Sequence, residues 1–154
     1  MNTNQKILLT SQGLAGLKKE YDHLINQKRP EAVERLAVAR GQGDLAENSE
    51  YTAARQDLAF IDGRIAELQL VLHDAKVITS HPKGKVNVGC KVTLHVNGKR
   101  ESFTIVGEWE ADPLQKKISH SSPLGTALIG KKVGEIVEVD APAGKIKYKI
   151  LTIN

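Results

Sequence analysis

The stretch Gly43-Asp44-Leu45-Ala46-Glu47-Asn48-Ser49-Glu50-Tyr51 decides the fold of this 154-residue chain. It gathers three carboxylates within seven residues, and it separates two segments whose apolar residues recur with helical spacing. Gly41 and Gly43 favour a turn between these segments. The sequence therefore predicts an antiparallel helical hairpin that carries acidic side chains at its far end.

The segment after this turn has an unbroken heptad pattern, which is typical of a helix packed along one partner helix. Its apolar residues follow one another at alternating steps of three and four: Tyr51, Ala54, Leu58, Ile61, Ile65, Leu68, Leu72 and Ala75. The segment before the turn shows the same spacing at Leu14, Leu17, Tyr21 and Leu24. With about 30 residues in each arm, the hairpin would extend about 45 Å.

Pro30 interrupts the pattern of the first arm, because proline lacks the N–H that an uninterrupted helix requires. The apolar stripe is expected to resume out of register at Val33, Leu36 and Ala37. Heptad spacing alone does not explain this break.

The acids of the turn have a structural interpretation as well as a functional one. Asp44 followed by Glu47 three residues later is also a good helix start, with Asp44 as the N-cap and Glu47 bonding back to it. Glu50 would add favourable charge near the positive end of the helix dipole. The two interpretations are compatible, because a cap at an exposed tip still presents carboxylate oxygens to solvent.

Composition excludes several classes of protein. Aromatic residues make up 4% of the chain, so no platform for stacking nucleic-acid bases is expected. The single cysteine, Cys90, excludes an intramolecular disulfide and a cysteine-based zinc cluster, and a buried inert thiol is expected. The five histidines share no ligand spacing. No secretory pattern and no apolar run approaching membrane-spanning length are present, so a soluble cytoplasmic protein is expected.

A domain boundary is expected near residue 80, where Ser80-His81-Pro82-Lys83-Gly84-Lys85 has the composition of a linker. Residues 1–79 carry ten basic and eleven acidic side chains, whereas residues 80–154 carry twelve and seven, a net charge of +5. A solvated sheet face explains this excess most simply. The second domain has no helix-turn-helix, zinc-finger or aromatic RNA-binding signature.

Residues 80–154 predict a small antiparallel sheet with one short helix. Val92, Leu94 and Val96 alternate on one face before Asn97-Gly98, a strong hairpin signal. Two further strands are predicted around Val137 and Tyr148. Between the pairs, Ser122-Pro123 supplies an N-cap and a first-turn proline for a helix that Gly130 ends. The predicted fold class is α+β: a helical hairpin over 1–79 followed by this sheet domain over 80–154.

The order and spacing of several short motifs resemble the bacterial transcript cleavage factors, the GreA/GreB family. The resemblance is carried by the turn motif itself and, along the rest of the chain, by Arg29-Pro30-Glu31, Ala53-Ala54-Arg55, Gly63-Arg64-Ile65, Ile105-Val106-Gly107, Ser122-Pro123-Leu124 and Leu128-Ile129-Gly130-Lys131. Each motif is weak alone, but together they are specific. Pro30 also fits the pattern of this family.

The resemblance implies a function in transcription. In that family the coiled coil enters the secondary channel of bacterial RNA polymerase, and the FKBP-like second domain docks on the channel rim. The factor is no enzyme itself; it stimulates the polymerase's own cleavage of backtracked RNA. By the same resemblance, Asp44 and Glu47 are the acidic pair implicated in this chemistry. A soluble monomer whose partners are the polymerase and the 3′ end of the nascent RNA is expected.

The acidic pair is a poor magnesium site by itself, because magnesium in proteins is held by one or two carboxylates together with waters and substrate phosphates. No tightly bound cofactor is therefore expected in the protein alone. Beside the polymerase's own metal and an RNA phosphate, Asp44 and Glu47 could complete a second, shared magnesium site. Either carboxylate could instead orient the attacking water as a base, and the sequence does not choose between these roles.

Three further groups have both a functional and a structural interpretation. Arg40 and Arg55 flank the tip; they would hold RNA phosphates, or would lie on a helix face and pair with Glu47 or Glu50. Ser122, Pro123 and Leu124 begin the short helix, and the resemblance implies that they also form the polymerase-docking surface. The competing functions are a channel-binding modulator or inhibitor without cleavage, and a peptidyl-prolyl isomerase suggested by the second domain alone.

Overall fold

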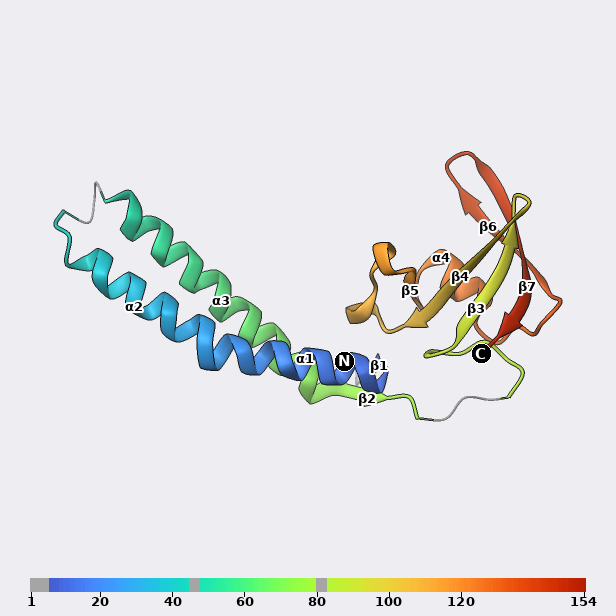
Figure 1. Cartoon of the computed structure of the whole chain (residues 1–154), viewed down its shortest axis with the longest axis horizontal. Coiled ribbons are helices and arrows are strands. Elements are labelled where there is room, and N and C mark those ends of the chain that lie inside the picture. The colour runs from blue at the N-terminus through green and yellow to red at the C-terminus, as the bar shows by residue number, and fades with distance from the viewer. Residues whose placement is uncertain (1–5, 45–47, 80–82) are drawn as a thin grey trace, which may run out of the picture. The chain divides into compact units, whose positions relative to one another are not determined.

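A computed structural model describes residues 6–44, 48–79 and 83–154. The chain divides into two compact units, of which Ala15–Asp74 is one and the remainder of the described chain is the other. Figure 1 shows the helices of the first unit and the twisted sheet of the second. No described helix is both long enough and apolar enough to cross a membrane.

The first arm of the hairpin is continuous through Pro30. It consists of α1 (Ser11–His23), the π-helical turn η1 (Leu24–Lys28) and α2 (Arg29–Arg40). The Arg29 N–H donates to the carbonyl oxygen of Leu24, five residues back, as a π-turn requires. Pro30 lies in the first turn of α2, where a missing N–H is tolerated.

The π-turn changes the register of the apolar stripe, and the expected stripe was wrong in part. Ala32 and Ala39 are buried and Leu36 is half-buried, whereas Val33 and Ala37 are exposed. An extra residue in one turn rotates the following helix, so the stripe continues at Ala32, Leu36 and Ala39, one residue later than uninterrupted heptads would place it.

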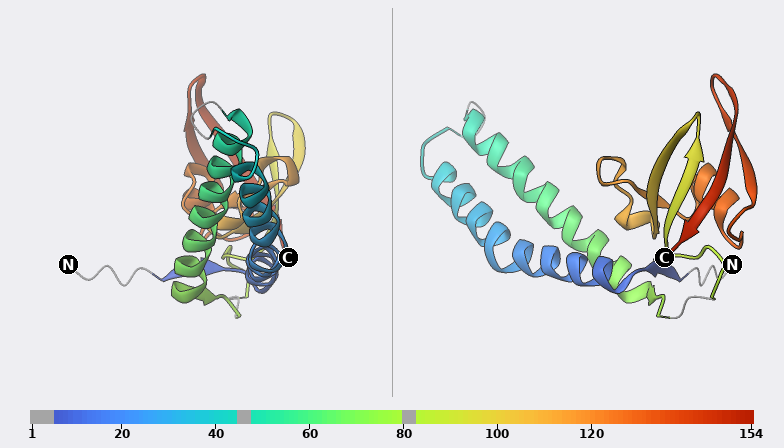
Figure 2. Two further views of the ribbon diagram at one scale, coloured as in Figure 1. Left: turned by 90° about the vertical axis from the view of Figure 1, so that its left-hand side faces the viewer. Right: turned by 45° about the vertical axis from the view of Figure 1, so that its right-hand side comes forward.

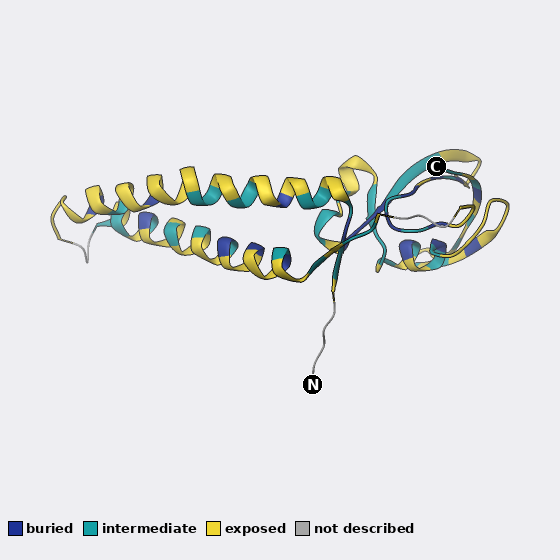
Figure 3. Ribbon diagram, turned by 90° about the horizontal axis from the view of Figure 1, so that it is seen from below, coloured by how far each residue is buried: buried dark blue, intermediate teal, exposed yellow. Residues whose placement is uncertain are grey.

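The second arm is α3 (Ser49–Asp74), and its heptad seam is confirmed. No seam residue within α3 is exposed, and the seam residues Ala54, Ile65 and Leu68 are buried. Figure 3 shows the buried and half-buried residues of the hairpin concentrated where the two arms face each other. The arms run side by side in both views of Figure 2. The helix ends one residue before Ala75, because Ala75 begins a strand.

Ion pairs connect the two arms at several positions along their length. Arg29 Nε lies 2.7 Å from Asp62 Oδ1, and Arg64 Nε lies 2.8 Å from Glu20 Oε1. These pairs are partly exposed, so each contributes at most about 1 kcal/mol. Their placement at successive turns favours one longitudinal register of the arms over shifted ones.

The second unit contains two sheets. Strands β1 (Ile7–Leu9) and β2 (Ala75–Val77) form a short parallel pair, which the sequence pattern did not predict. The larger sheet has the order β5-β4-β3-β7-β6. Its strands are β3 (Lys91–Val96), β4 (Lys99–Val106), β5 (Lys117–Ser119), β6 (Ile136–Ala141) and β7 (Gly144–Ile153). All its neighbours are antiparallel except β4 and β5, so the α+β class is confirmed with a mixed sheet.

The β-hairpin and the short helix of this unit lie where the sequence predicted them. Asn97 and Gly98 join β3 to β4, both with positive φ as a type I′ turn requires. Helix α4 (Pro123–Leu128) begins at Ser122, whose hydroxyl accepts the Gly125 N–H at 3.0 Å. Leu94, Ile105 and Ile150 are completely buried in the core, and Cys90 is buried beside them as expected.

A single carboxylate ties the start of α1 to the sheet. In the 3₁₀ turn η2 (Glu108–Glu110), the Glu110 side chain accepts the Thr10 N–H at 2.9 Å and the Thr10 hydroxyl. Thr10 in turn caps α1 by accepting the Gly13 N–H at 3.0 Å. A Cβ at Gly13 would lie 2.0 Å from Glu110 Cδ, so any larger residue here would force the Glu110 carboxylate to move. A further 3₁₀ turn, η3 (Pro113–Gln115), precedes β5.

Candidate functional site at the hairpin tip

The turn of the hairpin begins where α2 ends. The Gly41 N–H donates to the carbonyl oxygens of Ala37 at 3.3 Å and Val38 at 3.1 Å, which closes the last helical turn. Gly43 has a φ of +114°, a conformation that favours glycine. Asp44 follows with an exposed side chain. Glu47, the other predicted catalytic acid, lies outside the described residues.

Asn48, and not Asp44, caps α3. The Asn48 Oδ1 accepts the Tyr51 N–H at 3.1 Å, the contact made by an N-cap residue three positions before its donor. The part of the capping interpretation that involves Glu47 lies outside the described residues. Asp44 is not the N-cap of α3, because α3 begins at Ser49 with Asn48 as its cap. The reason is that asparagine caps about as well as aspartate and stands closer to the heptad seam.

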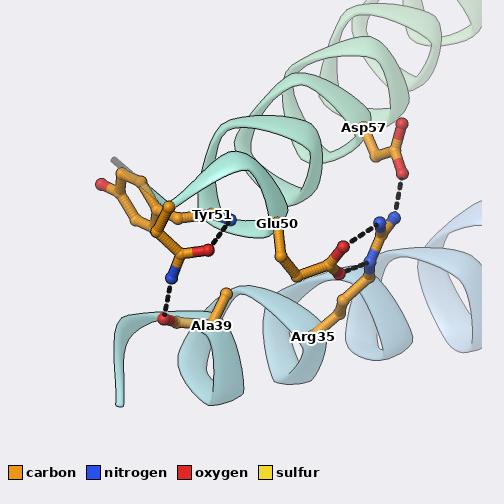
Figure 4. Close-up of polar contacts among 6 residues, drawn as sticks. Arg35, Ala39, Glu50, Tyr51 and Asp57 are labelled. Carbon is orange, nitrogen blue, oxygen red and sulfur yellow. Dashed lines mark hydrogen bonds and ion pairs between the residues drawn. The ribbon is translucent and has the colours of Figure 1, made fainter. Parts of the chain in front are cut away.

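The Asn48 side chain also connects the two arms. Its Nδ2 donates to the carbonyl oxygen of Ala39 at 2.8 Å, in the last turn of α2. In Figure 4 the two hydrogen bonds are the dashed lines that end at the labelled Ala39 and Tyr51. The Ala39 carbonyl oxygen also accepts the Gln42 N–H at 3.2 Å, so the Asn48 amide adds a second hydrogen bond at the end of α2 and links it to the start of α3.

Arg35 forms the second connection across the tip. Its guanidinium donates to both Glu50 carboxylate oxygens, at 2.6 and 3.2 Å, and to Asp57 (Figure 4). The hydrogen bond from Arg35 lowers the pKa of Glu50, and the same bond raises the pKa of Arg35. Glu50 lies in the first turn of α3 as predicted, and its carboxylate is held by this ion pair.

The predicted RNA-binding arginines lie on both sides of the tip. Arg40 is the last residue of α2, Arg55 lies in the second turn of α3, and both are exposed. Within the described part of the chain, neither forms an ion pair with a carboxylate, and Glu50 pairs with Arg35 instead. The expectation that they pair with Glu50 is therefore wrong. The alternative pairing with Glu47 lies outside the described residues, and the contact with RNA stays a prediction.

The described residues contain no group of three His, Cys, Asp or Glu side chains that could hold a metal ion. An exposed Asp44 in a turn fits magnesium only as one carboxylate of a shared site, with the other ligands supplied from outside the protein.

The predicted docking residues surround the start of α4. The Ser122 hydroxyl is occupied within the unit, since it donates to the Ser119 carbonyl oxygen at 2.7 Å and accepts from Gly125. Leu124 is half-buried against the core. Pro123 is exposed, so it is the member of the three that is most available to a partner.

Sequence reasoning missed Asn48 and Arg35 as the residues that hold the tip. Asn48 had a signal, since asparagine immediately before an apolar seam is a preferred N-cap. Arg35 had none, because it reaches partners 15 and 22 residues away whose position depends on the packing of the arms.

Comparison with known proteins agrees with this arrangement. The family model "Transcription elongation factor, N-terminal" matches residues 7–77, and "Transcription elongation factor, GreA/GreB, C-term" matches residues 81–154. The hairpin and the sheet domain thus define a transcription elongation factor. More particularly, the chain belongs to the GreA/GreB family.

Similar proteins match the chain over nearly its whole length. The transcription elongation factor GreA of Thermoanaerobacter pseudethanolicus is 47% identical over 154 residues, covering 97% of this chain and 98% of that protein. GreA of Clostridium acetobutylicum is 45% identical over 157 residues, covering 99% of each. The crystal structure of GreA factor homolog 1 (Gfh1) of Thermus thermophilus is 30% identical, covers 97% of this chain and 99% of that one, and has a TM-score of 0.46.

Proposed function

We propose that this protein enters the secondary channel of RNA polymerase with its hairpin and stimulates the polymerase's own cleavage of backtracked RNA. The observation that carries the proposal is the position of Asp44: it is exposed in the turn between the two arms of the hairpin, in a chain that belongs to the GreA/GreB family. An exposed carboxylate at this end of the hairpin is available to a metal ion or a water molecule supplied by a partner.

The two proposed catalytic acids act on the polymerase's substrate and not on one bound by this protein. Asp44 and Glu47 would hold a magnesium ion together with polymerase groups and an RNA phosphate. When bound, such an ion stabilises negative charge on the phosphate oxygens during hydrolysis. A carboxylate that does not bind the ion would orient the attacking water and accept its proton. The protein therefore contributes part of an active site and is not an enzyme alone.

The hairpin suits this task because its tip is held on both sides. The Asn48 amide joins the ends of α2 and α3, and Arg35 joins α2 to Glu50 and Asp57. Side chains that must act at a defined position need such support, since a displacement of about 1 Å can cost about a hundredfold in rate. Arg40 and Arg55 would contact phosphates of the displaced RNA end.

The sheet domain would dock on the rim of the channel. Pro123 at the exposed start of α4 is the proposed contact, with Ser122 shaping the turn and Leu124 supporting it from within. In this proposal the sheet domain binds the polymerase, and the helical hairpin places the acids near the RNA.

A channel-binding modulator that does not stimulate cleavage is the second candidate. It is favoured less, because the turn carries both Asp44 and Glu47. The deciding experiment adds the purified protein to a stalled, backtracked elongation complex and follows the length of labelled RNA. The proposal expects shortened RNA and resumed elongation; binding without shortened RNA would favour the modulator.

A further inference from the structure

The outer face of the large sheet carries a row of basic residues on three neighbouring strands, namely one arginine, one histidine and one lysine. His95 on β3 lies opposite Arg100 on β4 and opposite Lys149 on β7. Residues directly opposite one another in antiparallel strands point to the same face, and neighbouring strands are about 4.8 Å apart. All three residues are exposed, whereas their strand neighbours Leu94 and Ile150 are buried. We call Arg100, His95 and Lys149 the basic row.

The basic row has no acidic partner in the described chain. None of its three members forms an ion pair with a described carboxylate, and on β6 the residue opposite Lys149 is the exposed Ile136. The other lysines of β7 do face acids. Lys147 Nζ lies 3.7 Å from Glu138 Oε1, and Lys145 lies opposite Asp140. The positive charge of the face is therefore balanced near the β6–β7 turn and unbalanced at the basic row.

A row of hydroxyls lies beside the basic row. Thr93 is opposite Ser102 and Thr152, and the Thr93 and Ser102 hydroxyl oxygens are 3.1 Å apart. This hydroxyl row brings no charge, but it brings hydrogen-bond donors to the same face. Arginine, lysine, serine and threonine are the side chains that commonly contact nucleic-acid phosphates.

We propose that the basic row and the hydroxyl row bind the phosphodiester backbone of a nucleic acid. A row of positive charge is complementary to a polyanion. Nucleic acid is the polyanion we expect, because the chain belongs to a family of transcription elongation factors and a transcribing complex contains both DNA and RNA. The aromatic side chains of these strands, Phe103 and Tyr148, pack against the core instead of standing on this face. Binding is therefore to the backbone, without base stacking and without sequence preference.

This inference does not depend on the hairpin tip, so it can be tested without polymerase. Fluorescence anisotropy of the full-length protein is measured with a labelled 20-mer DNA duplex and with a labelled single-stranded 20-mer RNA, at several salt concentrations. Because Arg40 and Arg55 of the tip are proposed to contact RNA as well, binding supports the proposal when substitutions in the basic row weaken it, and the polymer bound more tightly identifies the source of the phosphates. An absence of binding to both at about 50 mM salt overturns it.

A pair of matched variants locates the site. Arg100→Gln with Lys149→Gln removes two charges from the basic row, whereas Lys145→Gln with Lys147→Gln removes the same charge from positions that face acids. The first pair should weaken binding by roughly tenfold. For duplex DNA it should also make the negative slope of log affinity against log salt less steep, by about 1.8. The control pair should change affinity less than about twofold, and Lys149→Arg should keep the parental affinity.

Equal losses in the two variant pairs would show a response to net charge alone and would overturn the proposal. Competition by poly-glutamate as effective as competition by unlabelled RNA would also overturn it, because the row would then accept any acidic polymer. Thermal melts of each variant verify folding, and since all four substituted side chains are exposed, parental melting is expected.

Discussion

The side-chain amide of Asn48 donates to the carbonyl oxygen of Ala39 at 2.8 Å and so joins the beginning of α3 to the end of α2. The same side chain caps α3 through its Oδ1. Two functions thus meet in one residue at the tip: starting a helix and fixing the distance between the arms.

Substitution of Asn48 separates these functions. Asn48→Asp keeps an N-cap but removes the donor to Ala39, whereas Asn48→Ala removes both. We expect Asn48→Ala to lower the free energy of unfolding by about 1–2 kcal/mol and Asn48→Asp to lower it by less. Cleavage stimulation should fall in both variants, because the tip is no longer tied. Parental cleavage by Asn48→Asp would show that the bond to Ala39 has no role in positioning the acids.

The ion pair between Arg35 and Glu50 predicts a pH-dependent stability. Arg35 lowers the pKa of Glu50 below its ordinary value of 4.5, so the folded protein binds fewer protons in acid than the unfolded chain. The pair therefore stabilises fully above that ordinary value, and the stabilisation is lost as the pH falls through the lowered pKa. Urea melts of the parent and of Glu50→Gln should differ most near neutral pH and converge in acid. A difference that is constant with pH would contradict this account.

Gly13 and Glu110 predict an energetic coupling within the sheet-containing unit. A Cβ at Gly13 would lie 2.0 Å from Glu110 Cδ, so Gly13→Ala should destabilise by about 1–3 kcal/mol. In a Glu110→Ala background the same change should cost at least about 0.5 kcal/mol less.

Gly16→Ala is the matched control on the same helix, because no atom lies within 4 Å of its added Cβ. It should stabilise the protein by up to about 1 kcal/mol through helix propensity. Thermal or urea melts measure the parent and the four variants: Gly13→Ala, Glu110→Ala, their combination and Gly16→Ala. Equal effects of Gly13→Ala in the two backgrounds would exclude the contact with Glu110.

The docking proposal predicts a specific effect at Pro123. Pro123→Glu places a charge at the exposed start of α4, where glutamate is compatible with a helix N-terminus, so folding should be kept. Affinity for RNA polymerase should fall by about tenfold or more if this residue is buried on docking. Leu124→Glu is less informative, since Leu124 packs against the core. Thr126→Glu, an exposed position on the same helix, tests whether charge anywhere on α4 has this effect.

The sequence predicted the features that depend on local chemistry. The heptad seam of α3, the Asn97-Gly98 turn, the Ser122 cap and the buried Cys90 were all predicted from residue type and spacing. Each depends on neighbours within a few positions, which a sequence pattern records directly.

The features that were missed depend on contacts between distant segments. Strands β1 and β2 are three residues each and pair across 68 positions in sequence, so neither shows an alternating pattern long enough to recognise. The π-turn before Pro30 moved the contact face of α2 by one residue. At the tip, the ion pair of Arg35 follows from the packing of two helices and leaves no local signal.

The central claim is that Asp44 and Glu47 act in chemistry at the tip, and one measurement tests it most directly. The rate of RNA cleavage in a backtracked complex is compared for the parent, for Asp44→Asn with Glu47→Gln, and for a control, Asp22→Asn with Glu34→Gln, that changes the same charges at exposed positions of the first arm. The account predicts parental melting and polymerase binding for both double variants. It predicts loss of stimulated cleavage by about tenfold or more for the tip variant alone, partly restored by extra magnesium. Cleavage at the parental rate by the tip variant, with binding intact, would contradict the claim.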